Sequence, residues 1–196
     1  MFKIPSHACT WDKDDGVTIP YFLCCCFFIQ IEFKKNCPNN DCKSDLKLEA
    51  QLEYDKTLGY FIVGTALTFA INVTISKTGD PSYGSNLYFT LPRALQYRRV
   101  DQAWGDTEIL CGFEEETEED QLSNKDYVLM CGFGNPMVNN TGVRFSLIIG
   151  VPDQVTDSEL NFFLNATTLS EETNTADNTK SLKLMLRNQV STAFRG

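Results

Sequence analysis

The chain has few of the groups on which acid–base catalysis and nucleic-acid binding depend. Its 196 residues include a single histidine, His7, and 17 Lys and Arg stand against 26 Asp and Glu, so the formal net charge is −9. Most general acid–base and nucleophilic schemes use a histidine, and nucleic-acid binding draws much of its free energy from cations that neutralise phosphates. The composition therefore predicts neither an enzyme nor a nucleic-acid-binding protein.

Long apolar runs are also missing. No stretch of eighteen apolar residues occurs, so we expect no direct membrane insertion by this chain. The longest apolar run, residues 21–29, has the length of a signal-peptide core, but the acidic residues Asp12, Asp14 and Asp15 precede it where basic residues are expected. We interpret residues 1–32 as an atypical N-terminal extension: a truncated neighbouring segment, an artefact of the gene model, or a signal sequence.

Cysteine, by contrast, is frequent. Of the eight cysteines, four lie in the body of the chain: Cys37, Cys42, Cys111 and Cys131. Four cysteines allow three connectivities. We favour the one in which each cysteine pairs with its nearest neighbour, which gives a short loop near residue 40 and a second bridge between residues 111 and 131.

Three acceptor sites for N-glycosylation point, with the cysteines, to an extracellular compartment. Asn72, Asn139 and Asn165 each begin an Asn-x-Thr sequence without proline in the middle position. Paired cysteines persist in oxidising environments. Together these features favour an extracellular protein.

Alternation with period two dominates the chain from residue 45 onward. In residues 66–76, Leu67, Phe69 and Ile71 begin one apolar face, whereas Asn72 lies on the polar face, where a glycan has room. The alternating segments are residues 46–54, 66–76, 87–91, 107–111, 127–131, 143–149, 160–166 and 182–186. Short strands separated by turn-rich segments predict an all-β sandwich, with a β-barrel as the alternative.

Several motifs, in the same order, resemble the first calf domain of integrin alpha subunits. A short loop between Cys37 and Cys42 is followed at once by an Asp-Leu-x-Leu strand. Residues 75–83 resemble the family's turn before a tyrosine, and Cys131 begins the sequence Cys-Gly-Phe-Gly-Asn-Pro-Met, its most specific motif. The resemblance covers residues 33–196.

The resemblance implies an immunoglobulin-like, two-sheet antiparallel β-sandwich over residues 33–196. It also implies a structural leg domain on the extracellular side of the plasma membrane, which supports cell adhesion and the bending or extension of a heterodimeric receptor. The implied partners are an integrin beta subunit and the neighbouring thigh and second calf domains.

A calcium ion at the knee, where the leg bends, is a further implication. In the family it is bound near the small disulfide loop by loop oxygens and an acidic side chain of the following turn. Carried over by position, its ligands here are Asn40, Asp41 and Asp80, and Ca²⁺ prefers such oxygen ligands. The alternative to a leg domain is a free-standing secreted immunoglobulin-like binding module.

Overall fold

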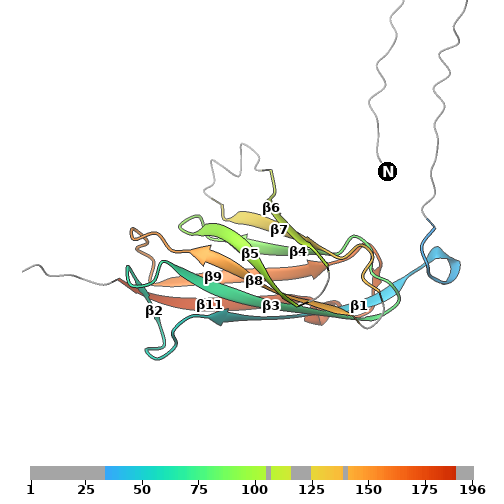
Figure 1. The fold of residues 1–196 in the computed structure, drawn as a ribbon, viewed down its shortest axis with the longest axis horizontal. Helices are drawn as coiled ribbons and strands as arrows, with labels where there is room; N and C mark the ends of the chain where they lie inside the picture. The colour runs from blue at the N-terminus through green and yellow to red at the C-terminus, as the bar shows by residue number, and fades with distance from the viewer. Residues whose placement is uncertain (1–33, 105–106, 116–124, 139–140, 189–196) are drawn as a thin grey trace, which may run out of the picture. The chain divides into compact units, whose positions relative to one another are not determined.

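The part of the chain that the structure describes forms two β-sheets packed face to face. The structure is a computed structural model that describes residues 34–104, 107–115, 125–138 and 141–188, so the predicted N-terminal extension lies outside it. One sheet has five strands in the order β10-β1-β3-β8-β5, and the other has six in the order β2-β11-β9-β4-β7-β6. The long strands of both sheets run in similar directions (Figure 1).

The five-stranded sheet consists of β1 (Lys43–Glu53), β3 (Thr68–Gly79), β5 (Gln96–Trp104), β8 (Gly142–Gly150) and β10 (Glu171–Glu172). The six-stranded sheet consists of β2 (Phe61–Val63), β4 (Asn86–Leu91), β6 (Ile109–Phe113), β7 (Tyr127–Phe133), β9 (Glu159–Thr167) and β11 (Thr179–Asn188). Two short 3-10 helices are described, η1 (Pro38–Asn40) and η2 (Thr175–Asp177).

Strand β3 shows why the sequence forms these sheets. Ile71, Val73 and Ile75 are buried, and Asn72 and Thr74 between them are only half-buried. Successive side chains of a strand point to opposite faces, so each apolar residue of this run enters the core. β3 lies in the middle of its sheet, between β1 and β8.

A chain of aromatic rings joins the two sheets. The ring of Phe69 on β3 lies 5.8 Å from that of Phe162 on β9, and Phe162 stacks on Phe89 of β4 with the ring centroids 5.8 Å apart. All three side chains are buried. Aromatic pairs at such distances stabilise a core beyond the area they bury, so this contact fixes one sheet against the other.

The predicted sandwich is confirmed, with two differences at the sheet edges. The sheets are not purely antiparallel, because β10 pairs with β1, and β2 with β11, in parallel. Strand β5 was not expected from the sequence. Its register against β8 shifts twice, and such irregularities interrupt the strict alternation by which strands are recognised.

Leu67 was predicted to face the core with Phe69, and this is wrong. Its side chain is 70% exposed. β3 begins only at Thr68. Leu67 therefore lies before the strand, where the backbone no longer directs every second side chain into the core as it does for Phe69.

In the described part of the chain, no helix has the length and the apolar character needed to cross a membrane.

Candidate functional site

A disulfide closes a short loop where the chain enters β1. The Cα atoms of Cys37 and Cys42 are 5.2 Å apart, and η1 lies between them. Pro38 stands at the start of η1, where its missing N–H costs nothing. Asn40 adopts a left-handed backbone conformation with φ of 62°, which asparagine tolerates better than most residues. The loop is thus a compact turn, and Pro38 and Asn40 suit the backbone conformations that it requires.

Asp80 attaches the turn after β3 to this loop. Its backbone N–H donates to the carbonyl oxygen of Lys43 at 2.8 Å, and the N–H of Lys43 donates to Asp80 Oδ2 at 3.1 Å. Gly79 precedes it with φ of 74°, and a Cβ there would lie 2.7 Å from the oxygen of Lys43, so only glycine fits without a shift of the backbone. Because Lys43 directly follows Cys42, these two bonds hold the turn and the disulfide loop together.

Tyr83 adds a contact to the segment before the loop. Its hydroxyl accepts the backbone N–H of Asn36 at 3.0 Å, and Lys35 Nζ lies 5.8 Å from the centre of its ring. The backbone N–H of Tyr83 donates to Ser170 Oγ at 3.2 Å. Tyr83, the tyrosine that ends the motif at residues 75–83, therefore connects the loop segment with the body of the sandwich.

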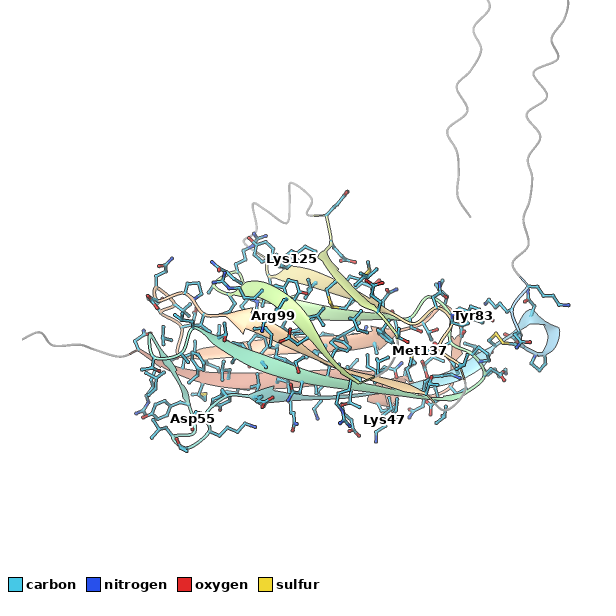
Figure 2. All side chains as sticks on the ribbon, in the orientation of Figure 1. Lys47, Asp55, Tyr83, Arg99, Lys125 and Met137 are labelled. Atoms are coloured by element: carbon cyan, nitrogen blue, oxygen red, sulfur yellow. A yellow bond between two sulfur atoms is a disulfide. The ribbon has the colours of Figure 1, made fainter. Side chains whose placement is uncertain are left out.

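Two motif segments that are far apart in the sequence meet at this end of the domain. Ser82 and Met137 exchange backbone hydrogen bonds of 2.8 and 2.9 Å. Tyr83 and Met137 accordingly lie at the same end in Figure 2. The hydroxyl of Ser82 also lies 2.8 Å from those of Ser85 and Thr168. The turn at 79–83 and the segment 131–137 thus form one hydrogen-bonded unit.

Lys77 is a residue of this region that the sequence reasoning missed. Its side chain is 1% exposed, and Nζ donates to the carbonyl oxygen of Gly79 at 2.7 Å. Burial lowers the pKa of Lys77, and the nearby Asp80 carboxylate opposes that shift. The alternation of β3 was the available signal, because Lys77 lies two residues after the buried Ile75.

The predicted calcium ligands fit a metal only in part. Asp41 is exposed, whereas Asn40 Oδ1 accepts the N–H of Lys35 and one Asp80 oxygen is used by Lys43. No group of three or more His, Cys, Asp or Glu side chains that could hold a metal ion is found among the described residues. A cation here would therefore depend on backbone carbonyls, which are ordinary Ca²⁺ ligands, and on groups beyond those described.

The second disulfide lies inside the six-stranded sheet. Cys111 on β6 and Cys131 on β7 are direct cross-strand partners with Cα atoms 4.0 Å apart. Cys131 is buried and Cys111 half-buried. The bridge ties the edge strand β6 to its neighbour. Both disulfides in the structure follow the nearest-neighbour pairing that the sequence favoured.

The three glycosylation candidates differ in their surroundings. Asn72 Nδ2 donates to a Glu53 carboxylate oxygen, and Asn72 Oδ1 accepts from Ser146 Oγ at 2.7 Å. Asn165 lies on β9, and no hydrogen bond of its side chain is found among the described residues. Asn139 lies outside the described residues.

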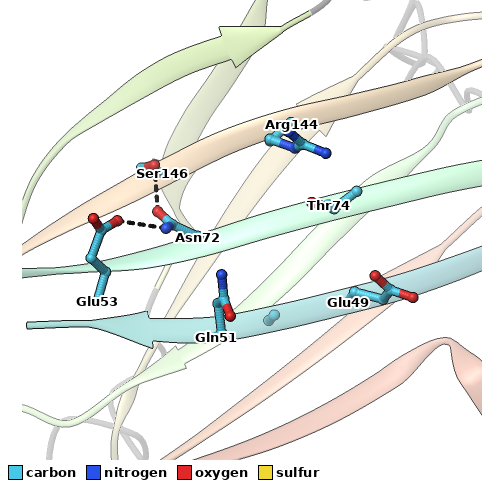
Figure 3. A pocket seen from close by; sticks show the side chains of 8 residues that line it. Glu49, Gln51, Glu53, Asn72, Thr74, Arg144 and Ser146 are labelled. Atoms are coloured by element: carbon cyan, nitrogen blue, oxygen red, sulfur yellow. Dashed lines mark hydrogen bonds between the residues drawn. The ribbon is translucent and has the colours of Figure 1, made fainter. Parts of the chain in front are cut away.

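Asn72 lies in a broad polar groove of about 610 Å³ on the outer face of the five-stranded sheet. Figure 3 shows that its lining side chains come from β1, β3 and β8, with Glu49 and Arg144 on either side of Thr74. Most of these side chains are polar or charged and lie at the surface of the sheet. The groove has neither a serine nor a cysteine paired with a histidine, so it offers no nucleophile with a base.

Comparison with known proteins assigns the family. The family model described as "Integrin alpha Ig-like domain 2" matches residues 37–186. Integrin alpha pat-2 of Caenorhabditis elegans is 27% identical over 169 residues, which cover 83% of this chain and 14% of the relative. Integrin alpha-PS2 of Drosophila melanogaster is 29% identical over 76% of this chain and 10% of the relative.

Human integrin alpha-8 is 24% identical over 81% of this chain and 14% of its own length. The chain thus spans about a seventh or less of these three relatives. The family match begins at Cys37, the first cysteine of the short loop, and extends to Leu186 in β11. The chain belongs to the family of the second immunoglobulin-like domain of integrin alpha subunits.

Proposed function

We propose that this domain is a structural leg module of an integrin-type alpha subunit, in which it supports cell adhesion and the bending and extension of the receptor. The observation that carries this proposal is the attachment of the disulfide loop to the sandwich through Lys43 and Asp80. A loop fixed in this way transmits the position of a preceding segment to the body of the domain. The family is not an enzyme family, and the proposed role is mechanical.

The proposed partners follow from the family. They are an integrin beta subunit and the thigh and second calf domains of a full-length alpha subunit, on the extracellular side of the plasma membrane. The two disulfides support an oxidising location. In the same compartment we propose glycosylation at Asn72, Asn139 and Asn165, which all begin acceptor sequences.

Calcium at the knee is also proposed, with a reduced ligand set. Asp41 supplies an exposed carboxylate, and backbone carbonyls of the short loop supply further oxygens. Asn40 and Asp80 already accept hydrogen bonds from Lys35 and Lys43, so they are weaker candidates than the sequence predicted. The ion would stiffen the loop, whereas the core beneath it does not depend on metal.

A domain exchange tests the leg role. The matched region of Integrin alpha pat-2 is replaced by residues 37–186 of this chain, and the chimera is co-expressed with a beta subunit. We expect the chimera to assemble, reach the cell surface and support adhesion. The matched control is the same chimera with Phe162→Asp, which places a charge in the core between the sheets.

The control chimera is expected to be retained in the cell. A first chimera that folds, as judged by protection of Cys111 and Cys131 from thiol reagents, but does not assemble with the beta subunit would contradict the proposal. Such a result would favour the free-standing binding module.

A further inference from the structure

The outer face of the six-stranded sheet carries several exposed apolar side chains. Phe163 on β9 is 46% exposed, Met130 on β7 37% and Leu110 on β6 66%. Half-buried Tyr88 on β4 lies between two of these strands, because it pairs with Met130 on one side and with β9 on the other. Apolar side chains that gather on one exposed face in this way mark a candidate site of interaction.

Asn165 lies within this apolar face. It is the direct cross-strand partner of Tyr88, and it follows Phe163 by two residues on the same strand. Phe163, Asn165 and Thr167 therefore share the outer face, whereas Ala166 between them is buried. The glycosylation sequon and two aromatic side chains are thus neighbours on one surface.

The side-chain amide of Asn165 is also free to react. No hydrogen bond to it is found among the described residues, whereas the Asn72 amide is held between Glu53 and Ser146. Attachment of a sugar to Asn72 replaces one of the two hydrogens on an amide nitrogen that already donates to Glu53, and requires room beside that contact. Attachment to Asn165 breaks no contact of this kind.

We propose that Asn165 is N-glycosylated and that the first sugars of its glycan lie flat on Phe163 and Tyr88, covering the apolar face of the six-stranded sheet. This inference rests on the proposed extracellular location. The donor is an oligosaccharide linked to a polyprenyl diphosphate. A bond forms between Asn165 Nδ2 and the anomeric carbon, the bond from that carbon to the diphosphate oxygen breaks, and the amide proton leaves with the diphosphate.

The distances suit such a contact. Cross-strand partners have Cβ atoms roughly 5 Å apart, and residues two positions apart on a strand are separated by about 7 Å. An N-acetylglucosamine ring attached to Asn165 therefore reaches the rings of both Tyr88 and Phe163. One face of that sugar presents only C–H groups, which pack on the negative face of an aromatic ring.

Beyond Phe163 the same face continues into a shallow groove that suits the sugars that follow. The groove has a volume of about 410 Å³ and includes polar groups of Asn161, Ser181 and Lys183 beside Phe163. Asn161 lies four residues before Asn165, roughly 13 Å along the strand, which is within reach of two or three linked sugars. Hydroxyl groups of the sugars would find donors and acceptors there.

The experiment compares glycoforms of the full chain secreted by eukaryotic cells. An endoglycosidase trims the glycan to one N-acetylglucosamine, and the thermal midpoint is measured with and without the sequon, which Thr167→Ala removes. Each form is made with Phe163, with Phe163→Ala and with Phe163→Leu. The Leu variant keeps apolar bulk, so that a general effect of lost surface is separated from loss of the aromatic ring.

We expect the sugar to raise the midpoint of the wild type by about 2–4 °C, and Phe163→Ala and Phe163→Leu to remove more than half of that rise. Asn72 serves as the matched control, because its sugar should give no shift that depends on Phe163. An equal rise in all three Phe163 forms would overturn the contact. Peptide mapping that finds Asn72 occupied and Asn165 empty would overturn the inference yet leave the extracellular assignment intact. If neither Asn72 nor Asn165 carried a glycan, the result would count against both the inference and the extracellular assignment.

Discussion

Cys111 and Cys131 face each other directly across β6 and β7, with Cα atoms 4.0 Å apart. β6 is the last strand of the six-stranded sheet and pairs only with β7 among the described strands. The bridge joins two cysteines that are 20 positions apart in the sequence. It therefore ties down an edge strand in which Ile109 is the one buried residue.

Removing this bridge is expected to destabilise the domain. The double variant Cys111→Ala/Cys131→Ala should lose about 3 kcal/mol of unfolding free energy, because closing a loop of this length restricts the unfolded chain by that amount. Urea denaturation measures the loss. The double variant Cys37→Ala/Cys42→Ala is the control. Its loop is shorter, so its loss should be smaller, about 2 kcal/mol, and equal losses would contradict the account.

Adjacent residues on β9 should respond very differently to truncation. Phe162 is buried against Phe69 and Phe89, whereas Phe163 points to the outer face. We expect Phe162→Ala to cost about 3–5 kcal/mol. Phe163→Ala in the unglycosylated chain should cost less than about 0.5 kcal/mol. Similar costs at both positions, in the same denaturation experiment, would mean that Phe162 does not face the core while Phe163 faces outward.

Glu172 should make stability depend on pH. Burial, with the like charge of Asp45, raises the pKa of Glu172, although the N–H of Leu46 opposes this by donating to Oε1 at 3.0 Å. A carboxyl whose pKa is raised on folding favours the protonated folded state. Its stabilising contribution is present below the ordinary value of 4.5 and is lost as pH rises through the raised pKa.

The measurement is the difference in unfolding free energy between the wild type and Glu172→Gln, from pH 4 to pH 8. The wild type should become less stable relative to the variant as pH rises from 4.5 through the raised pKa of Glu172, and the difference should then level off. Glu49→Gln is the control. The exposed pair with Lys47 lowers the pKa of Glu49, so its contribution is lost only as pH falls below the ordinary value of 4.5, and the difference should stay nearly constant over this range. A flat difference for Glu172→Gln would show that its carboxylate is well solvated in the folded state.

Asp80 should be needed for the attachment of the short loop and not for the core. Asp80→Ala removes the acceptor for the N–H of Lys43, which should cost about 1 kcal/mol. Hydrogen exchange at the Lys43 amide should accelerate, while amides of β8 keep their protection. Asp55→Ala, in an exposed turn, is the control. Unchanged exchange at Lys43 would remove the structural basis of the proposed leg role.

Chelation of calcium should leave the thermal midpoint of the chain unchanged to within about 1 °C, because a weakly bound ligand adds little stability. The described residues have no acidic cluster suited to a metal, and the core lies between the sheets. A melt with and without EDTA measures this. Collapse of the domain on chelation would show that calcium belongs to its fold.

Local patterns made much of the fold predictable. Apolar residues at every second position, as in Ile71, Val73 and Ile75, select strands with one buried face, and this held for the eight segments named from the sequence. The cysteines were close enough in sequence for nearest-neighbour pairing to match the structure. Strand β5 was missed because its two register shifts interrupt the alternation, and the exposed position of Leu67 depends on where β3 begins.

The sequence by itself determined most of the side chains that face the core, because alternation is a local property of each strand; the exposed Leu67 and the buried Lys77 are exceptions. Only the tertiary structure decided which strands lie next to one another and in which register. Asp80 meets Lys43, and Asn165 meets Tyr88, across pairings between distant segments. Such pairings depend on how two complete sheets bury their apolar faces against each other, and no local pattern encodes them.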